Sequence, residues 1–226
     1  ARPSGKITAT ARISDTLNVD GKITSDRLSA SGVTMTKLKA DLNYDNTNSK
    51  AGGRITSGTL STNGITLANL LADLNYGIKT NRAELEKFRA NLGRGTITAS
   101  GNAGLNDNTF SAKADAVNID TRAIPGLKDL DGRYMLTAIA SGRYTDMNSI
   151  IASARLEGRN ISYAGTSMGN MTLPVTYTDS KVNIPMAEVS IPGGALSFWG
   201  NADLKNISNP VLNLGASTGS INIANI

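Results

Sequence analysis

The feature that most constrains this chain is a regular alternation of apolar and polar residues. From Ile7 to Ile23 the apolar side chains fall on odd positions, interrupted at Asp15 and Gly21, where we expect turns. Successive side chains of a β-strand point to opposite faces, so a period of two predicts strands with one apolar face. The alternation returns in later segments, at 97–105, 110–114, 152–156, 182–186 and 196–204. The sequence therefore predicts an all-β chain that is more than half strand.

Turn-forming residues separate these segments at short intervals. Asn106-Asp107-Asn108 and Thr178-Asp179-Ser180 are of the kind that favours tight turns, and Pro192-Gly193-Gly194 is another. Short connections join antiparallel neighbours, because parallel strands need a long crossover. We therefore expect an antiparallel meander.

Residues 82–92 fit two structures. Leu85, Phe88 and Leu92 are three and four residues apart, a spacing typical of a helix. However, residues 92–105 align without a gap on residues 191–204, and Pro185 precedes that second copy. A helix resists proline, whereas a strand edge or end accepts it. We predict a strand at 82–92, with a short helix as the alternative.

A second repeat is a hairpin that recurs three times, at 28–44, 60–76 and 161–177. In each copy an apolar strand reaches a glycine, turns, and returns as a strand that ends in tyrosine. Repeats of this kind stack so that each unit contacts only its neighbours. We interpret residues 1–226 as a single repetitive β-sheet segment.

A sheet with one apolar face must cover that face. No long helix is expected, and only 4% of the residues are aromatic, so a dense sandwich core would be underfilled. We expect a long, curved antiparallel sheet folded into an open trough with an apolar interior, which suits an extended apolar ligand. The residues expected to line this groove are Ile7, Ala9, Ala11, Ile13, Leu17, Val19, Leu28, Leu42, Ile97, Ala99, Leu105, Phe110, Leu156, Ile184, Leu196, Phe198 and Leu204.

The composition excludes several chemistries. The chain has no Cys and no His, which rules out thiolate and imidazole metal sites, cysteine nucleophiles and Ser-His-Asp triads. Asp129-Leu-Asp131-Gly132 resembles part of a calcium loop but lacks the remaining ligands, so we interpret it as a turn. The net charge of +5 comes from scattered Lys and Arg, without the clustering typical of nucleic-acid binding. We expect no catalytic residues, no cofactor, no metal and no nucleic-acid partner.

Several motifs resemble a known family. Leu196-Ser-Phe-Trp-Gly-Asn-Ala-Asp-Leu204, the segment from Ile124 to Tyr134 and the later Ser141-Gly-Arg-Tyr144 are similar to the AsmA-like superfamily of bacterial envelope proteins, and within it to the TamB group. The resemblance implies a periplasmic rod of a diderm bacterium, anchored in the inner membrane and reaching an outer-membrane barrel protein. It also implies a lengthwise β-groove for phospholipid acyl chains, which shields them in transit between the membranes and contributes to outer-membrane biogenesis.

Two further expectations concern other classes of protein and the ends of the chain. The alternative to a lipid conduit is a structural or adhesive β-solenoid, similar to an autotransporter passenger, whose closed core would not admit a fatty acid. Without a recognisable anchor or barrel-contacting end, the chain is expected to be a middle piece of a longer protein. Its edge strands, near 6–12 and 220–226, would then pair with other strands, and the fragment is expected to self-associate through them.

Overall fold

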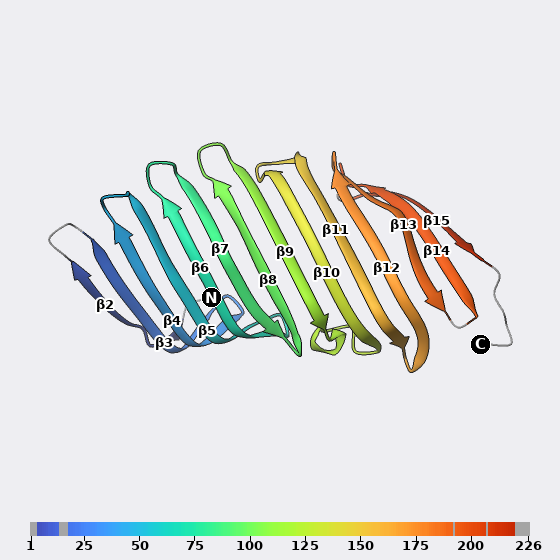
Figure 1. Ribbon diagram of the computed structural model, residues 1–226, viewed down its shortest axis with the longest axis horizontal. Helices are drawn as coiled ribbons and strands as arrows, with labels where there is room; N and C mark the ends of the chain where they lie inside the picture. The colour runs from blue at the N-terminus through green and yellow to red at the C-terminus, as the bar shows by residue number, and fades with distance from the viewer. Residues whose placement is uncertain (1–3, 14–17, 192, 207, 220–226) are drawn as a thin grey trace. The chain divides into compact units, whose positions relative to one another are not determined.

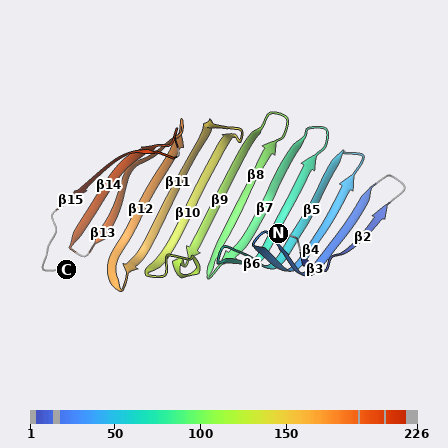
Figure 2. The same ribbon diagram turned by 180° about the vertical axis from the view of Figure 1, so that it is seen from behind.

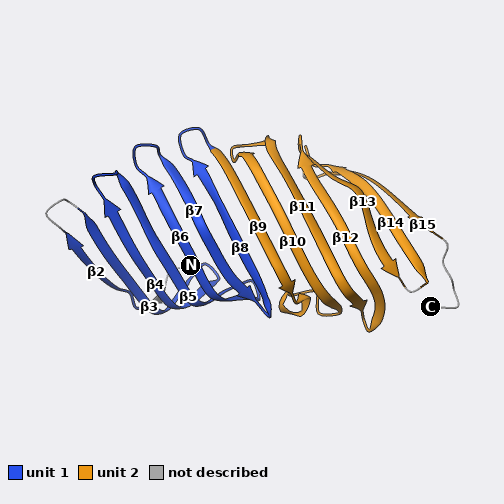
Figure 3. Ribbon diagram, in the orientation of Figure 1, with its two compact units in different colours: residues 1–108 blue, residues 109–226 orange. Residues whose placement is uncertain are grey.

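The computed structural model describes residues 4–13, 18–191, 193–206 and 208–219. Strands make up 78% of the described residues, so the prediction of an all-β protein is confirmed. Residues 82–92 form strand β7 (Arg82–Leu92) and not a helix. Across the described ranges, the one helical element is the short 3-10 turn η1 (Thr121–Ala123). The chain divides into two compact units, residues 1–108 and 109–226 (Figure 3).

Unit 1 is an antiparallel sheet in which consecutive strands from β2 to β8 are neighbours (Figure 1). The order is β1-β3-β4-β5-β6-β7-β8, and β2 also pairs with β3, beside β1. Besides β7, the strands are β1 (Ser4–Gly5), β2 (Thr8–Ile13), β3 (Val19–Ala30), β4 (Val33–Asp45), β5 (Lys50–Thr62), β6 (Ile65–Gly77) and β8 (Gly95–Gly104).

Unit 2 is a second antiparallel meander, with the order β9-β10-β11-β12-β13-β14-β15, seen from behind in Figure 2. Its strands are β9 (Thr109–Ile119), β10 (Leu130–Arg143), β11 (Asp146–Tyr163), β12 (Thr166–Thr178), β13 (Lys181–Ile191), β14 (Gly194–Asp203) and β15 (Val211–Thr218). Every strand pair described within the two units is antiparallel, which confirms the predicted antiparallel arrangement.

The three predicted hairpin repeats are all hairpins in the structure. Each turn consists of two residues with positive φ, the second of which is glycine: Gly32 at 81°, Gly64 at 79° and Gly165 at 84°. A two-residue turn with positive φ at both positions matches the right-handed twist of the strands that it joins. The glycines therefore explain why the chain reverses at these points.

Strands β4 and β6 of unit 1 change their alternation near the middle. In β6, Leu70 and Ala72 share a face with Leu67, although Leu67 and Leu70 are three residues apart. The change falls at Asn69, whose φ is 51°. Lys37 of β4 has a φ of 50° at the matching repeat position. Irregular residues of this kind bend a strand and re-aim its side chains, and here they keep the apolar residues on one face.

A similar irregularity explains the helix-like spacing in β7. The register shifts between Leu85 and Phe88, so Glu86 and Lys87 form a bulge and both flanking apolar residues stay on the same face. Strand β13 has the corresponding shift between Ile184 and Ala187. The spacing of three residues thus arises from a β-bulge and not from a helical turn.

Burial in both units is shallow, as expected of a single layer of strands. Across the described residues no large side chain is fully buried, and the most enclosed residues are Ala90 and Ala187. Large side chains lean over neighbouring glycines: a Cβ on Gly53 would lie 2.7 Å from Leu42 Cδ2, and one on Gly200 would lie 2.6 Å from Leu214 Cδ2. Neighbouring large and small residues thus cover the backbone without a second layer.

Candidate apolar ligand-binding face

The apolar face of unit 1 is built from rows of paired residues that cross six neighbouring strands, β3 to β8. Residues that are paired across antiparallel strands point to the same side, so each row shares one face. Four such rows, which define this face, are Val19–Tyr44–Ala51–Tyr76–Ala83–Ala103, Gly21–Leu42–Gly53–Leu74–Leu85–Gly101, Ile23–Ala40–Ile55–Ala72–Phe88–Ala99 and Leu28–Met35–Leu60–Leu67–Leu92–Gly95. None of these residues carries a charge.

The apolar face of unit 2 is built in the same way and is also free of charge. The long row runs from β9 to β15, and shorter rows lie beside it. These rows, which define this face, are Ala112–Ala140–Ala152–Tyr177–Val182–Ala202–Leu212, Ala114–Ala138–Ala154–Val175, Ala116–Leu136–Leu156–Leu173, Ile184–Gly200–Leu214 and Ala187–Phe198–Ala216.

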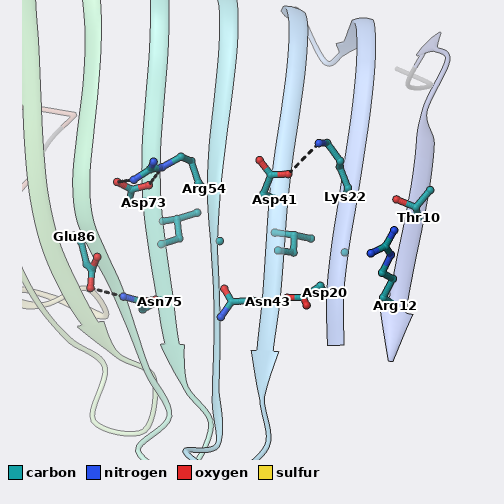
Figure 4. A pocket seen from close by; sticks show the side chains of 14 residues that line it. Thr10, Arg12, Asp20, Lys22, Asp41, Asn43, Arg54, Asp73, Asn75 and Glu86 are labelled. Atoms are coloured by element: carbon teal, nitrogen blue, oxygen red, sulfur yellow. Dashed lines mark hydrogen bonds and ion pairs between the residues drawn. The ribbon is translucent and has the colours of Figure 1, made fainter. Parts of the chain in front are cut away.

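The opposite face of unit 1 carries the charges. One row across β3 to β7 alternates in sign, Lys22–Asp41–Arg54–Asp73–Lys87. Arg54 Nε donates to Asp73 Oδ1 at 2.6 Å, which holds the pKa of that carboxyl below its usual value, and Lys22 Nζ lies 3.7 Å from Asp41. Figure 4 shows Lys22, Asp41, Arg54 and Asp73 in a shallow polar hollow that Asn75 and Glu86 also line. The charges pair with one another across the strands.

Several large apolar side chains lie open on the charge-free faces. Leu42 and Leu74 are 40% and 39% exposed in unit 1, and Leu214 is 78% exposed in unit 2. Hydrophobic side chains that gather on one exposed face of a soluble protein mark a binding surface more often than scattered ones do. A hydrocarbon ligand on these faces would displace water without desolvating a charge.

Tyrosines lie along one edge of each apolar face, and hydrogen bonds join the neighbouring loops at that edge. Tyr44 Oη donates to Asn46 Oδ1 at 3.0 Å, Tyr76 hydrogen-bonds with Asn81, and Tyr177 Oη donates to the Met147 carbonyl at 3.2 Å. Successive loops are joined by main-chain bonds of 2.8–2.9 Å, from Ile78 N to Ser49 O, Leu105 N to Asn81 O and Leu204 N to Ser180 O. The tyrosine hydroxyls therefore give this apolar edge a polar rim.

The structure divides the predicted lining residues between the units. Ala9, Ala11 and Ile13 of β2 pair with Ile23, Gly21 and Val19, which confirms that this set shares one face. Leu28, Leu42, Ile97 and Ala99 lie on the same unit 1 face, and Phe110, Leu156, Ile184, Leu196 and Phe198 lie on that of unit 2.

Three of the predicted lining residues lie outside the strands, and a fourth lies outside the residues that the structure describes. Ile7 precedes β2, while β8 ends at Gly104 and β14 at Asp203, so the prediction that Leu105 and Leu204 continue these strands is wrong. Both residues donate their main-chain N–H groups to neighbouring loops, which is why they leave the ladder. Leu17 and the C-terminal segment 220–226 lie outside the described residues.

The packed part of the unit 1 face was missed by the sequence reasoning. Leu70, Ala72 and Ala90 form a buried cluster, and the half-buried Ile55, Leu60, Leu67, Leu85 and Phe88 pack against it. The signal was present as apolar pairs three residues apart, Leu67 with Leu70 and Leu85 with Phe88. A rule of strict alternation overlooks such pairs, because each bulge shifts the pattern by one residue.

The segment with the partial calcium motif forms part of a turn and the start of β10. Asp131 Oδ1 accepts a hydrogen bond from Gly132 N at 2.8 Å, and the nearby Asp129 carbonyl accepts from Ala164 N at 2.8 Å. No group of three or more acidic side chains able to hold a metal ion occurs within the ranges that the structure describes.

Comparison with known proteins yields no match: no protein-family model, no curated protein and no solved structure is similar to this chain. The described part of the chain also contains no helix long and apolar enough to cross a membrane. We therefore infer function from the two uncharged faces.

Proposed function

We propose that the apolar faces of the two units bind the hydrocarbon chains of lipids, and that the protein acts as a non-enzymatic carrier of phospholipid between membranes. The observation that carries this proposal is the absence of charge from paired rows that cross six neighbouring strands in unit 1, while the opposite face holds an alternating row of charges. A sheet exposed to water on both faces would have no reason to separate its residues in this way.

The energetics favour a long, unbranched ligand. Each methylene that leaves water for an apolar surface contributes about 0.8 kcal/mol, so a chain of several methylenes binds without any specific polar contact. The strands curl into an open trough in this proposal, and the acyl chains lie against its floor. The phospholipid head group remains in water, near the rim where Tyr44 and Tyr76 carry their hydroxyls.

This function agrees with the AsmA-like proteins that the sequence resembles. A protein of that kind works in the periplasm, anchored in the inner membrane and in contact with an outer-membrane barrel protein, and contributes to outer-membrane biogenesis. The edge strands would then continue into neighbouring strands. These parts of the proposal rest on the resemblance, whereas binding of hydrocarbon rests on the geometry.

A titration with a fluorescent fatty acid tests the binding step. The rows that define both faces hold no carboxylate, amine or guanidinium group, so we expect affinity to be unchanged between about pH 8 and pH 9, where the fatty acid itself stays ionised, and between low and high salt. Fatty acids with shorter chains should bind more weakly, because the binding free energy weakens in proportion to the number of methylenes lost. Affinity that depends on salt and not on chain length would place the ligand on the charged face instead.

A further inference from the structure

The strongest irregularity in unit 2 lies between β12 and β13. Thr172 pairs with Glu188 and Thr176 with Asn183, but residues 173–175 of β12 have no partner in β13. On the far side of β12 the pairing with β11 is continuous through Arg155 and Pro174. The interruption, which we call the β12–β13 seam, comprises residues 173–175 and 184–187.

Two prolines explain the interruption. Pro174 lies in the unpaired part of β12, and Pro185 lies at the bulge of β13. Proline has no main-chain N–H group, so it cannot donate to a sheet ladder and is normally confined to edges and bulges. Here the two prolines face the same gap from adjacent interior strands, and two donors are missing at one level of the sheet.

The repeat provides a matched comparison in unit 1. The alignment of residues 92–105 with 191–204 places Glu86 at the position of Pro185, and the alignment of the hairpins places Asp73 at the position of Pro174. The β6–β7 ladder continues past its bulge, since Asp73 pairs with Lys87 and Leu74 pairs with Leu85. The same bulge is therefore compatible with a closed ladder where the prolines are absent.

We infer that the β12–β13 seam is the line along which unit 2 opens, so that β13–β15 moves as a group relative to β9–β12. The strands on each side keep their own ladders, β11 with β12 and β14 with β15, so opening breaks few hydrogen bonds. Segments with few protected hydrogen bonds open at lower free energy than the unit as a whole. This inference does not depend on the lipid that the unit binds.

Amide hydrogen exchange on the full chain tests the inference. We expect the main-chain amides on either side of the interruption, those of residues 172, 176, 183, 186 and 188, to exchange, as a group, at least about tenfold faster than those of residues 71, 75, 84, 87 and 89, which match them in unit 1. They should also exchange faster than residues 136–140 of β10, which serve as the reference within unit 2. Equal exchange in the matched sets, or uniformly fast exchange throughout unit 2, would overturn the inference.

Substitution of the two prolines tests whether they cause the interruption between β12 and β13. Pro174→Thr with Pro185→Thr restores both N–H groups, so exchange at residues 172, 176, 183, 186 and 188 should slow by about fivefold or more while residues 136–140 are unchanged. If that variant does not fold, Asp73→Pro provides the converse test and should create fast exchange at residues 71, 75, 84 and 87 of unit 1. Unchanged exchange in the variant that folds would show that the prolines do not make the seam.

Discussion

A single carboxylate on the apolar face should separate ligand binding from folding. Ala99 lies on that face of β8, paired with Phe88, while the next residue, Ser100, is exposed and points to the opposite side. Ala99→Asp and Ser100→Asp therefore place the same group on the two faces of one strand. Aspartate is unfavourable in strands by up to about 1 kcal/mol, and this cost is common to both variants.

The difference in stability and in fatty-acid affinity between the two variants measures the effect of placing the carboxylate on the apolar face. Because a one-layer sheet leaves the carboxylate introduced at position 99 accessible to water, we expect Ala99→Asp to be destabilised by no more than about 1 kcal/mol beyond Ser100→Asp. A bound hydrocarbon chain would remove that water. Burial of an uncompensated polar group costs about 1–3 kcal/mol or more, so fatty-acid affinity should fall roughly tenfold to a hundredfold or further in Ala99→Asp alone.

The assay combines urea unfolding with a fluorescent fatty-acid titration on the wild type and both variants. Loss of affinity in Ala99→Asp with similar unfolding midpoints is the expected result. If Ala99→Asp loses stability and affinity to the same extent, the face is a closed core and the reasoning is refuted. If Ser100→Asp loses affinity equally, the ligand does not lie on the uncharged face.

Three further predictions concern stability. Leu70→Ala should lower the free energy of unfolding by about 2–3 kcal/mol, because Leu70 lies in the buried cluster, while Leu214→Ala should change it by less than about 0.5 kcal/mol; urea unfolding of each variant decides this. Hydrogen bonds from Arg54 lower the folded-state pKa of Asp73, so the stability that this carboxylate contributes is present above its ordinary pKa and is lost as the pH falls through the folded value. Asp73→Asn should therefore reduce the loss of unfolding free energy at acid pH, and an unchanged loss would contradict this. Burial raises the pKa of Tyr134 above its ordinary value, so stability is lost as the pH rises through the folded value, and Tyr134→Phe should abolish this alkaline loss in thermal melts.

The strands and their faces could be predicted from the sequence, because period-two alternation has one structural meaning. Ala9, Ala11 and Ile13 share a face in the structure for the reason given by their spacing. The bulges could not be predicted from alternation. Asn69 and Lys37 adopt positive φ without being glycine, and such positions depend on the neighbouring strands.

The ends of some strands also could not be predicted from the alternation. Leu105 continues the alternation of β8 in sequence, yet its main-chain N–H bonds to the Asn81 carbonyl of another loop. The boundary near residue 108 has no shift in composition, since both sides repeat the same kinds of residue. The row from Lys22 to Lys87 depends on the registers of four strand pairs, which the sequence does not specify.

The most direct test of lipid binding is native mass spectrometry of the purified chain, followed by lipid extraction and a count of the bound molecules. We predict adducts with the mass of phospholipid that are displaced by added fatty acid and reduced in Ala99→Asp but not in Ser100→Asp. A chain that carries no lipid after purification from membrane-containing lysate, and that takes up none from phospholipid vesicles, would contradict the proposed function.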